Sequence, residues 1–124
     1  MRPILLIDDQ KTMIELFSRI LIENGYEVVS FIDPVEALTK VIDVNPALIL
    51  CDYHMPELNG VEVCAKLRGE LKYHDGFFLI LTNKVRWGEE GDDFHDLPDG
   101  WIDKTFDVSK FLEIVSMWYN MVPQ

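Results

Sequence analysis

The sequence predicts one α/β domain: a doubly wound, five-stranded parallel sheet with helices on both faces. Two observations indicate this fold. Short apolar runs of strand length alternate with helical patterns, and the connections between them are short, with no internal repeat or linker. The chain has 124 residues, 48% of them hydrophobic and 27% charged, which suits a single core and argues against disorder. We therefore treat residues 1–124 as one domain.

Five strands are predicted from short, mostly apolar segments. They are Ile4–Ile7, Val28–Ile32, Ala47–Cys51, Phe77–Leu81 and Trp101–Ile102. The first and third are continuous apolar runs, which is typical of strands covered on both faces. In a sheet of this kind, binding sites form beyond the carboxyl ends of the strands.

Capping residues mark most ends of the predicted helices. Asp33, Asn59 and Asp107 are the expected first caps of three helices, and Asn24-Gly25 and Asn45-Pro46 are the expected ends of two. The apolar residues at helical spacing are Met13, Leu16, Phe17, Ile20 and Leu21, then Leu38, Val41 and Ile42, then Val61, Cys64, Leu67 and Leu71, and finally Val108, Phe111, Leu112, Val115 and Trp118.

Residues 88–100 depart from this pattern. A fourth helix belongs here, but the segment carries several Gly and Asp residues and one Pro, all poor helix formers. We expect a short or irregular helix and a mobile loop, with the acidic run 89–99 solvated. Trp87 and Phe94 are expected to pack against the domain, because exposed large apolar patches are rare on monomers.

Composition also excludes several classes of function. The chain has 11 Lys and Arg against 22 Asp and Glu, a formal net charge of -11, which disfavours direct binding to nucleic acid or anionic lipid. No apolar run reaches the length of about 7 residues that a secretory signal needs, or the length of about 20 that a membrane span needs. Cys51 and Cys64 lack metal-site spacing and are expected to be buried free thiols, so we expect a reducing, cytoplasmic location.

Polar residues follow four of the predicted strands. Asp8 and Asp9 follow the first, Asp52 the third, Thr82 the fourth and Lys104 the fifth, so parallel strands bring them to one edge. Two carboxylates about 4 Å apart repel by about 4 kcal/mol at an effective dielectric of about 20, so three require cations. Mg²⁺ and the lysine would supply them, and such a carboxylate can attack phosphorus. Each residue alone has an ordinary interpretation as a cap, a turn residue or a surface lysine; the ordered set carries the argument.

This ordered set resembles the receiver domain of two-component response regulators over nearly the whole chain. Residues 52–60, Asp-Tyr-His-Met-Pro-Glu-Leu-Asn-Gly, are similar to the family's phosphoacceptor loop, and the spacings from Asp52 to Thr82 and on to Lys104 match the family's. The resemblance implies a flavodoxin-like fold of the CheY type. It also implies that Asp52 accepts a phosphoryl group from a phosphohistidine on a sensor histidine kinase or histidine phosphotransfer protein.

The resemblance implies roles for the other residues. Those that would hold Mg²⁺ or Mn²⁺ are Asp8, Asp9, Asp52 and the backbone carbonyl of His54. Lys104 and Thr82 would bind phosphoryl oxygens, and Thr82 and Trp101 would form the switch that changes contacts with a downstream effector protein of unknown identity. The domain would be a signalling module and not a conventional enzyme, although it would catalyse its own phosphorylation and slow dephosphorylation.

Departures from the family pattern bear on the switching geometry, and two of them, Lys104-Thr105 and the irregular fourth-helix region, motivate an alternative function. Lys104-Thr105 stands where the family has Lys-Pro with a cis bond, and a cis bond before a residue other than proline costs about 3–4 kcal/mol. Asn83 replaces a small residue, and Trp101 is larger than the usual Tyr or Phe. The alternative is a receiver-like interaction scaffold that phosphate does not switch.

Enzymes of the same layered architecture are a third class. A flavin carrier would need a Ser/Thr/Gly-rich phosphate loop after the first strand, and residues 8–12 are not one. A haloacid-dehalogenase-like phosphatase would have a second Asp where Gln10 stands. Neither pattern is present.

Overall fold

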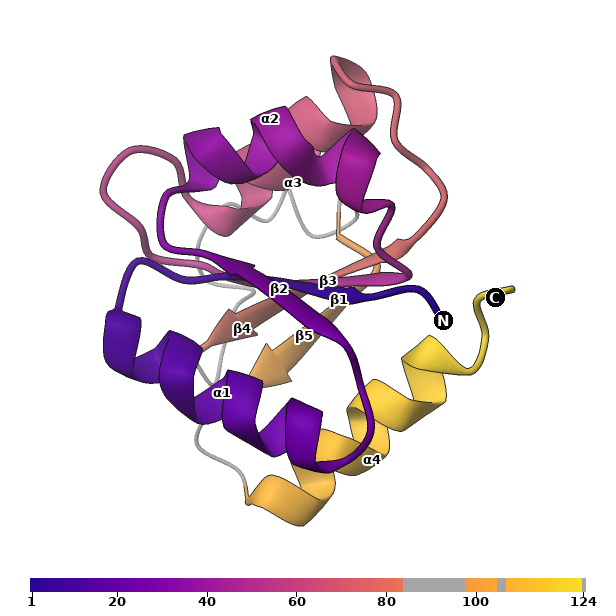
Figure 1. Ribbon diagram of the computed structural model, residues 1–124. Helices are drawn as coiled ribbons and strands as arrows, with labels where there is room; N and C mark the ends of the chain where they lie inside the picture. Colours follow the sequence, from indigo (N-terminus) through magenta and orange to yellow (C-terminus); the bar gives the residue numbers. More distant parts are fainter. Residues whose placement is uncertain (84–97, 105–106, 124) are drawn as a thin grey trace.

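The computed structural model describes residues 1–83, 98–104 and 107–123, and these residues form a three-layer α/β domain. Five parallel strands lie in the order β2-β1-β3-β4-β5. Helices α2 and α3 cover one face of the sheet and α1 and α4 cover the other (Figure 1). The elements are β1 (Ile4–Ile7), α1 (Lys11–Glu23), β2 (Val28–Phe31), α2 (Pro34–Val44), β3 (Leu48–Asp52), α3 (Gly60–Gly69), β4 (Phe77–Thr82), β5 (Gly100–Asp103) and α4 (Val108–Tyr119).

The predicted fold class is confirmed, and each predicted strand is present with ends that differ by at most one residue. The expected fourth helix, Trp87, Phe94 and most of the acidic run lie outside the described residues. Asp99, at the end of that run, is described; it is exposed and lies outside the helices and strands, as expected for a solvated loop. Its carboxylate accepts hydrogen bonds from the backbone N–H of Phe78 at 2.7 Å and from Arg68 at 2.9 Å.

Two hydrophobic clusters, one on each face of the sheet, hold the layers together. Successive residues of a strand point to opposite faces. Leu6 and Leu50 accordingly belong to the cluster under α1 and α4, whereas Leu5 and Ile49 belong to the cluster under α2 and α3. Because both faces are covered, every residue of β1 and β3 is buried, as their continuous apolar sequences predicted.

The predicted helix caps are present. The side chains of Asp33, Asn59 and Asp107 accept hydrogen bonds from the backbone N–H groups of their first turns, at 2.7–2.9 Å. Gly25, with φ of 92°, and Asn45, with φ of 52°, follow α1 and α2 in the left-handed conformation that ends helices.

Several residues expected to face the sheet do not. Leu16, Ile42 and Val108 are 49%, 54% and 51% exposed, so their predicted burial is wrong. Ile42 lies about 100° around α2 from the buried Val41, which turns it away from the sheet. Leu16 and Val108 line a groove between α1 and α4. Leu71 is only partly buried, because α3 ends before it.

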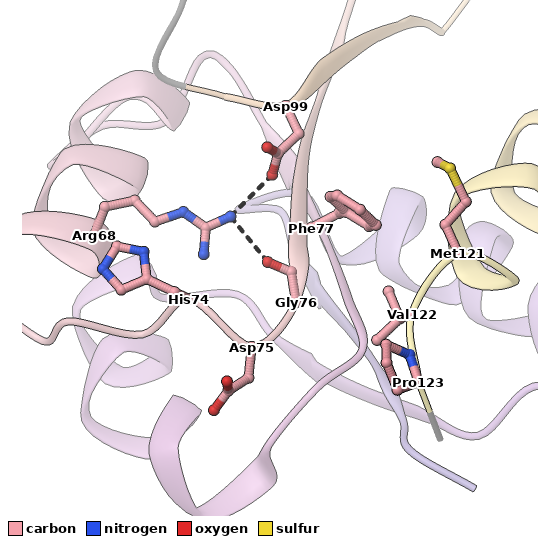
Figure 2. A pocket seen from close by; sticks show the side chains of 9 residues that line it. All are labelled: Arg68, His74, Asp75, Gly76, Phe77, Asp99, Met121, Val122 and Pro123. Atoms are coloured by element: carbon pink, nitrogen blue, oxygen red, sulfur yellow. Dashed lines mark hydrogen bonds and ion pairs between the residues drawn. The ribbon is translucent and has the colours of Figure 1, made fainter.

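Hydrogen bonds from Arg68 connect the loops at the edge of the sheet where β4 begins. Arg68 of α3 donates to the backbone carbonyls of Tyr73, at 2.6 Å, and Gly76, at 2.9 Å, as well as to Asp99. This guanidinium lines an open cavity that extends to residues 121–123 near the C-terminus (Figure 2). The cavity has a volume of about 290 Å³. Phe77, the first residue of β4, lines this cavity. The cavity therefore lies at the edge of the sheet opposite the carboxyl ends of the strands.

Candidate functional site

The sheet brings the strand-end residues to one edge. Asp8 directly follows β1, Asp52 is the last residue of β3, Thr82 ends β4 and Lys104 follows β5. All neighbouring strands are parallel and in register, so these four positions lie at the same edge. The convergence predicted from the sequence is therefore present.

Lys104 joins two of the carboxylates directly. Its Nζ donates to Oδ1 of Asp52 at 2.7 Å and to Oδ2 of Asp8 at 3.1 Å. The Lys104 side chain is 9% exposed, so water screens these contacts weakly. The backbone N–H of Lys104 also donates to the carbonyl of Thr82 at 2.8 Å, which fixes the lysine to the end of β4.

Three carboxylates form a group that can hold a cation. Asp8, Asp9 and Asp52 each offer an oxygen, and these oxygens lie within 4.8 Å of one another. Oδ1 of Asp9 is buried and has no hydrogen-bond partner among the described residues. A buried acceptor without a partner costs about 1–3 kcal/mol, and a hard divalent ion ligated by oxygen would remove that cost. The donor set therefore fits Mg²⁺ or Mn²⁺.

Burial and the neighbouring charges shift the protonation of the central pair. Burial raises the pKa of Asp52, the hydrogen bond and charge of Lys104 oppose this, and the charges of Asp8 and Asp9 add to it. Burial alone would lower the pKa of Lys104, but its hydrogen bonds and attraction to Asp52 and Asp8 prevail, so its pKa is raised. The lysine thus stays charged, and a divalent cation would favour the ionised form of Asp52.

The loop after β3 is held rigidly next to Asp52. The backbone N–H of Tyr53 donates to the carbonyl of Leu81 at 3.0 Å, and the carbonyl of Tyr53 accepts from the N–H of Gly60 at 2.9 Å. A Cβ atom on Gly60 would lie 2.8 Å from the carbonyl oxygen of Asp52, so only glycine fits there without a shift. Asn59 and Glu62 form a capping box at the start of α3. These contacts fix the backbone that presents Asp52.

The two expected switch residues and His54 lie on or beside β3, β4 and β5 at this edge. Thr82 is buried, and Trp101 packs against the cluster under α2 and α3. The exposed His54 places its ring against that of Tyr53. The Lys104-Thr105 bond includes a residue outside the described ranges, so the departure expected there has no structural description.

Sequence reasoning missed two contributors to the site. The backbone N–H of Gln10 donates to Oδ1 of Asp8 at 3.0 Å and orients that carboxylate. This bond joins residues two apart, the pattern of an Asx turn, so the sequence contained a usable signal. The second contributor is Tyr53, for which the sequence offered no signal. Its ring contacts the rings of both His54 and Trp101.

A groove between α1 and α4 opens beside the lysine. It has a volume of about 210 Å³, and its lining is mainly apolar, with Lys104, Gln10 and Asn83 among the polar residues. The edge of the sheet that carries the carboxylates and Lys104 thus borders a mostly apolar surface.

Fold and site together define a class: a doubly wound α/β domain with buried carboxylates and a lysine at the carboxyl edge of the sheet, an arrangement suited to phosphoryl transfer. The chain belongs to the response regulator receiver domain family, whose sequence profile matches residues 4–116.

Relatives and solved structures agree with this membership. The chain is 30% identical over 112 residues to the DNA-binding dual master transcriptional regulator RpaA of Synechocystis sp., covering 90% of this chain and 46% of RpaA. It is 39% identical over 83 residues to the alkaline phosphatase synthesis transcriptional regulatory protein PhoP of Bacillus subtilis, covering 67% of this chain and 34% of PhoP. The chain thus spans about half or less of the length of these two relatives.

Two solved structures match over almost their full length. The chemotaxis protein CheY4 of Vibrio cholerae has a TM-score of 0.82 at 28% identity, with 95% of this chain and 98% of CheY4 covered. The response regulator TrrA of Thermotoga maritima, solved in complex with Mg²⁺ and BeF, has a TM-score of 0.81 at 29% identity, with 95% of this chain and 99% of TrrA covered.

Family membership makes this chain a receiver domain of the response regulators of two-component signalling. Receiver domains bind Mg²⁺ through acidic residues, and the group of Asp8, Asp9 and Asp52 suits that ion. They also interact with histidine kinases and with downstream effectors. Within the described ranges, no helix combines the length and apolar character needed to cross a membrane.

Proposed function

We propose that Asp52 accepts a phosphoryl group in a reaction that depends on Mg²⁺ or Mn²⁺. The observation that carries this proposal is the contact of one buried ammonium, that of Lys104, with both Asp52 and Asp8, beside the unpartnered buried oxygen of Asp9. A carboxylate oxygen of Asp52 attacks phosphorus, a P–O bond forms, and the P–N bond to the donor's histidine breaks. The departing imidazole keeps the electron pair of that bond and takes up a proton.

The remaining residues hold the reacting groups. The metal would be held by Asp8, Asp9, Asp52 and the backbone carbonyl of His54, and when bound it offsets the negative charge of the phosphoryl oxygens. Lys104 and the hydroxyl of Thr82 bind the other phosphoryl oxygens. Lys104 is already held at the end of β4 by its backbone bond to Thr82, so both donors lie on connected backbone.

Phosphorylation then changes protein contacts through Thr82 and Trp101. We propose that residues 1–124 act as one receiver domain whose donor is a sensor histidine kinase or histidine phosphotransfer protein. The output is contact with an effector protein, because the formal net charge of -11 opposes direct binding to nucleic acid. The buried thiols of Cys51 and Cys64 suit the reducing cytoplasm expected for such a domain.

The test is chemical phosphorylation by a small donor. Incubation with acetyl phosphate and Mg²⁺ is expected to add one labile phosphate, seen in the intact mass, and EDTA or Asp52→Asn is expected to abolish it. Asp75→Asn, an equal charge change at an exposed residue of the opposite edge, serves as the control and should leave the adduct unchanged. An adduct that persists in Asp52→Asn would contradict the proposal.

The alternative of an unswitched scaffold makes the opposite prediction for a phosphate mimic. Beryllofluoride with Mg²⁺ would then leave the amide NMR spectrum unchanged around Thr82 and Trp101. We expect clear shifts at both residues, since three carboxylates and the Lys104 ammonium lie together at the site that we propose binds the mimic.

A further inference from the structure

Three aromatic rings form a line of contacts from the phosphoacceptor loop to strand β5. The ring of His54 lies edge-on to that of Tyr53, with centroids 4.7 Å apart and planes at 81°. The ring of Tyr53 lies 6.0 Å from that of Trp101, with planes at 46°. Both distances are in the range of favourable aromatic pairs. Tyr53 therefore connects a residue of the proposed metal site with the proposed switch residue.

The register of the sheet explains why Tyr53 and Trp101 meet. Trp101 is paired in register with Ile80, and Ile80 with Cys51. Residues two apart in a strand share a face, so Tyr53 and Thr82 continue the rows of Cys51 and Ile80 on the face covered by α2 and α3. Both Tyr53 and Trp101 pack against the hydrophobic cluster on that face.

The backbone of Tyr53 cannot move independently of Asp52. Its N–H and C=O are both bonded, to Leu81 and Gly60, and Gly60 approaches the carbonyl of Asp52 too closely to allow a Cβ. A displacement of the segment that carries Asp52 and the carbonyl of His54 would therefore be passed to the Tyr53 ring. That ring packs against Trp101.

We propose that Tyr53 is a positioning residue of the switch: its ring holds Trp101 in its resting packing and transmits to it the change made at Asp52. This inference rests on the proposed function, and it adds a second route to Trp101 beside the one through Thr82. Tyr53 takes no part in the phosphoryl chemistry, so its ring can be removed without removing a ligand or a reacting atom.

The test separates binding from transmission. Beryllofluoride with Mg²⁺ is added to the full chain and to Tyr53→Phe, which keeps the ring, and Tyr53→Leu, which removes it. Binding is read from the ¹⁹F NMR signal of bound beryllofluoride. Transmission is read from the indole N–H resonance of Trp101, assigned by its loss in Trp101→Phe. Thermal melting confirms folding, and Tyr53→Met replaces Tyr53→Leu if the latter does not fold.

We expect all three proteins to bind beryllofluoride. The Trp101 resonance should shift in the natural chain and in Tyr53→Phe, whereas the shift should fall roughly threefold or more in the variant without a ring. An undiminished shift in Tyr53→Leu, an equal loss in Tyr53→Phe, or binding without any Trp101 response in the natural chain would overturn the inference and leave phosphoacceptance standing. Absence of bound beryllofluoride in every protein would instead overturn the proposed function.

Discussion

The ammonium of Lys104 lies 2.7 Å from Oδ1 of Asp52, although 52 positions separate the two residues in the chain. The two side chains are 9% and 10% exposed, so the pair is shielded from water. A buried ion pair contributes modestly to stability when intact, but removal of one partner leaves an uncompensated buried charge. Here Asp8 and Asp9 increase that imbalance, because their charges also act on Asp52.

Replacement of Lys104 is therefore expected to destabilise the fold in the absence of metal. Lys104→Met should lower the free energy of unfolding, measured by urea denaturation in EDTA, by about 3–5 kcal/mol. The control is Lys66→Met, which removes an exposed ion pair with Glu70, 3.2 Å in length, and should cost below about 1 kcal/mol. Equal effects of the two variants would show that the central charges are screened.

Mg²⁺ should stabilise the domain, and Asp9 should carry much of that effect. The cation would bind the folded acidic group and not the unfolded chain, so a concentration about 100 times the dissociation constant adds about 2.7 kcal/mol. Asp9→Asn should reduce this gain, because a neutral amide replaces a carboxylate with a buried, unpartnered oxygen. Urea denaturation with and without Mg²⁺ measures the gain, and Asp75→Asn is the control. A gain unchanged in Asp9→Asn would place the ion elsewhere.

Stability should fall above pH 9 because of the buried thiols. Burial raises the pKa of Cys64 to about 11 from an ordinary value of 9.0, and it also raises the pKa of Cys51. Between these values the unfolded chain releases the Cys64 proton while the folded chain keeps it, so the unfolded state is favoured as pH rises. Two pKa units correspond to about 2–3 kcal/mol.

Cys64→Ala should make this alkaline loss of stability shallower in urea denaturation between about pH 8 and 12, which extends about one pH unit beyond each end of the pKa shift. Part of the slope should remain, because the pKa values of Cys51, Tyr73 and Tyr119 are also raised by burial. A slope identical to that of the natural chain would show that the folded Cys64 thiol titrates normally.

Gly60→Ala should damage both stability and phosphorylation. Its Cβ would lie 2.8 Å from the carbonyl oxygen of Asp52 and 3.3 Å from Ile80, so the phosphoacceptor strand or α3 must shift. Such overpacking costs about 1–3 kcal/mol, and we expect a slower rate of adduct formation with acetyl phosphate. Gly69→Ala is the matched control in the same helix, since nothing lies within 4 Å of its added Cβ. Its stability should stay the same or rise slightly.

Local patterns in the sequence were sufficient for much of the fold. The caps at Asp33, Asn59 and Asp107 are bonds between residues two or three apart, so they follow from short segments alone. The strands could be placed because apolar runs that are buried on both faces differ from helical patterns. The convergence of Asp8, Asp52 and Lys104 then followed from the rule that parallel strands end at one edge.

Only the tertiary structure decided which side chains touch. Leu16 and Val108 have the periodicity of buried residues, but they line an open groove, because burial depends on whether another element covers the helix. The position of Asp99 in an acidic run did not reveal its bonds to Arg68 and Phe78.

The sequence by itself determined the family, the order of the elements and the set of residues at the carboxyl edge of the sheet. These features depend on local propensity and strand order. The bonds of Lys104 to two carboxylates and the contact of Tyr53 with Trp101 were decided by tertiary packing. Those contacts join residues that are distant in the chain. Their distances depend on the register in which β3, β4 and β5 pair, and no single segment of the sequence encodes that register.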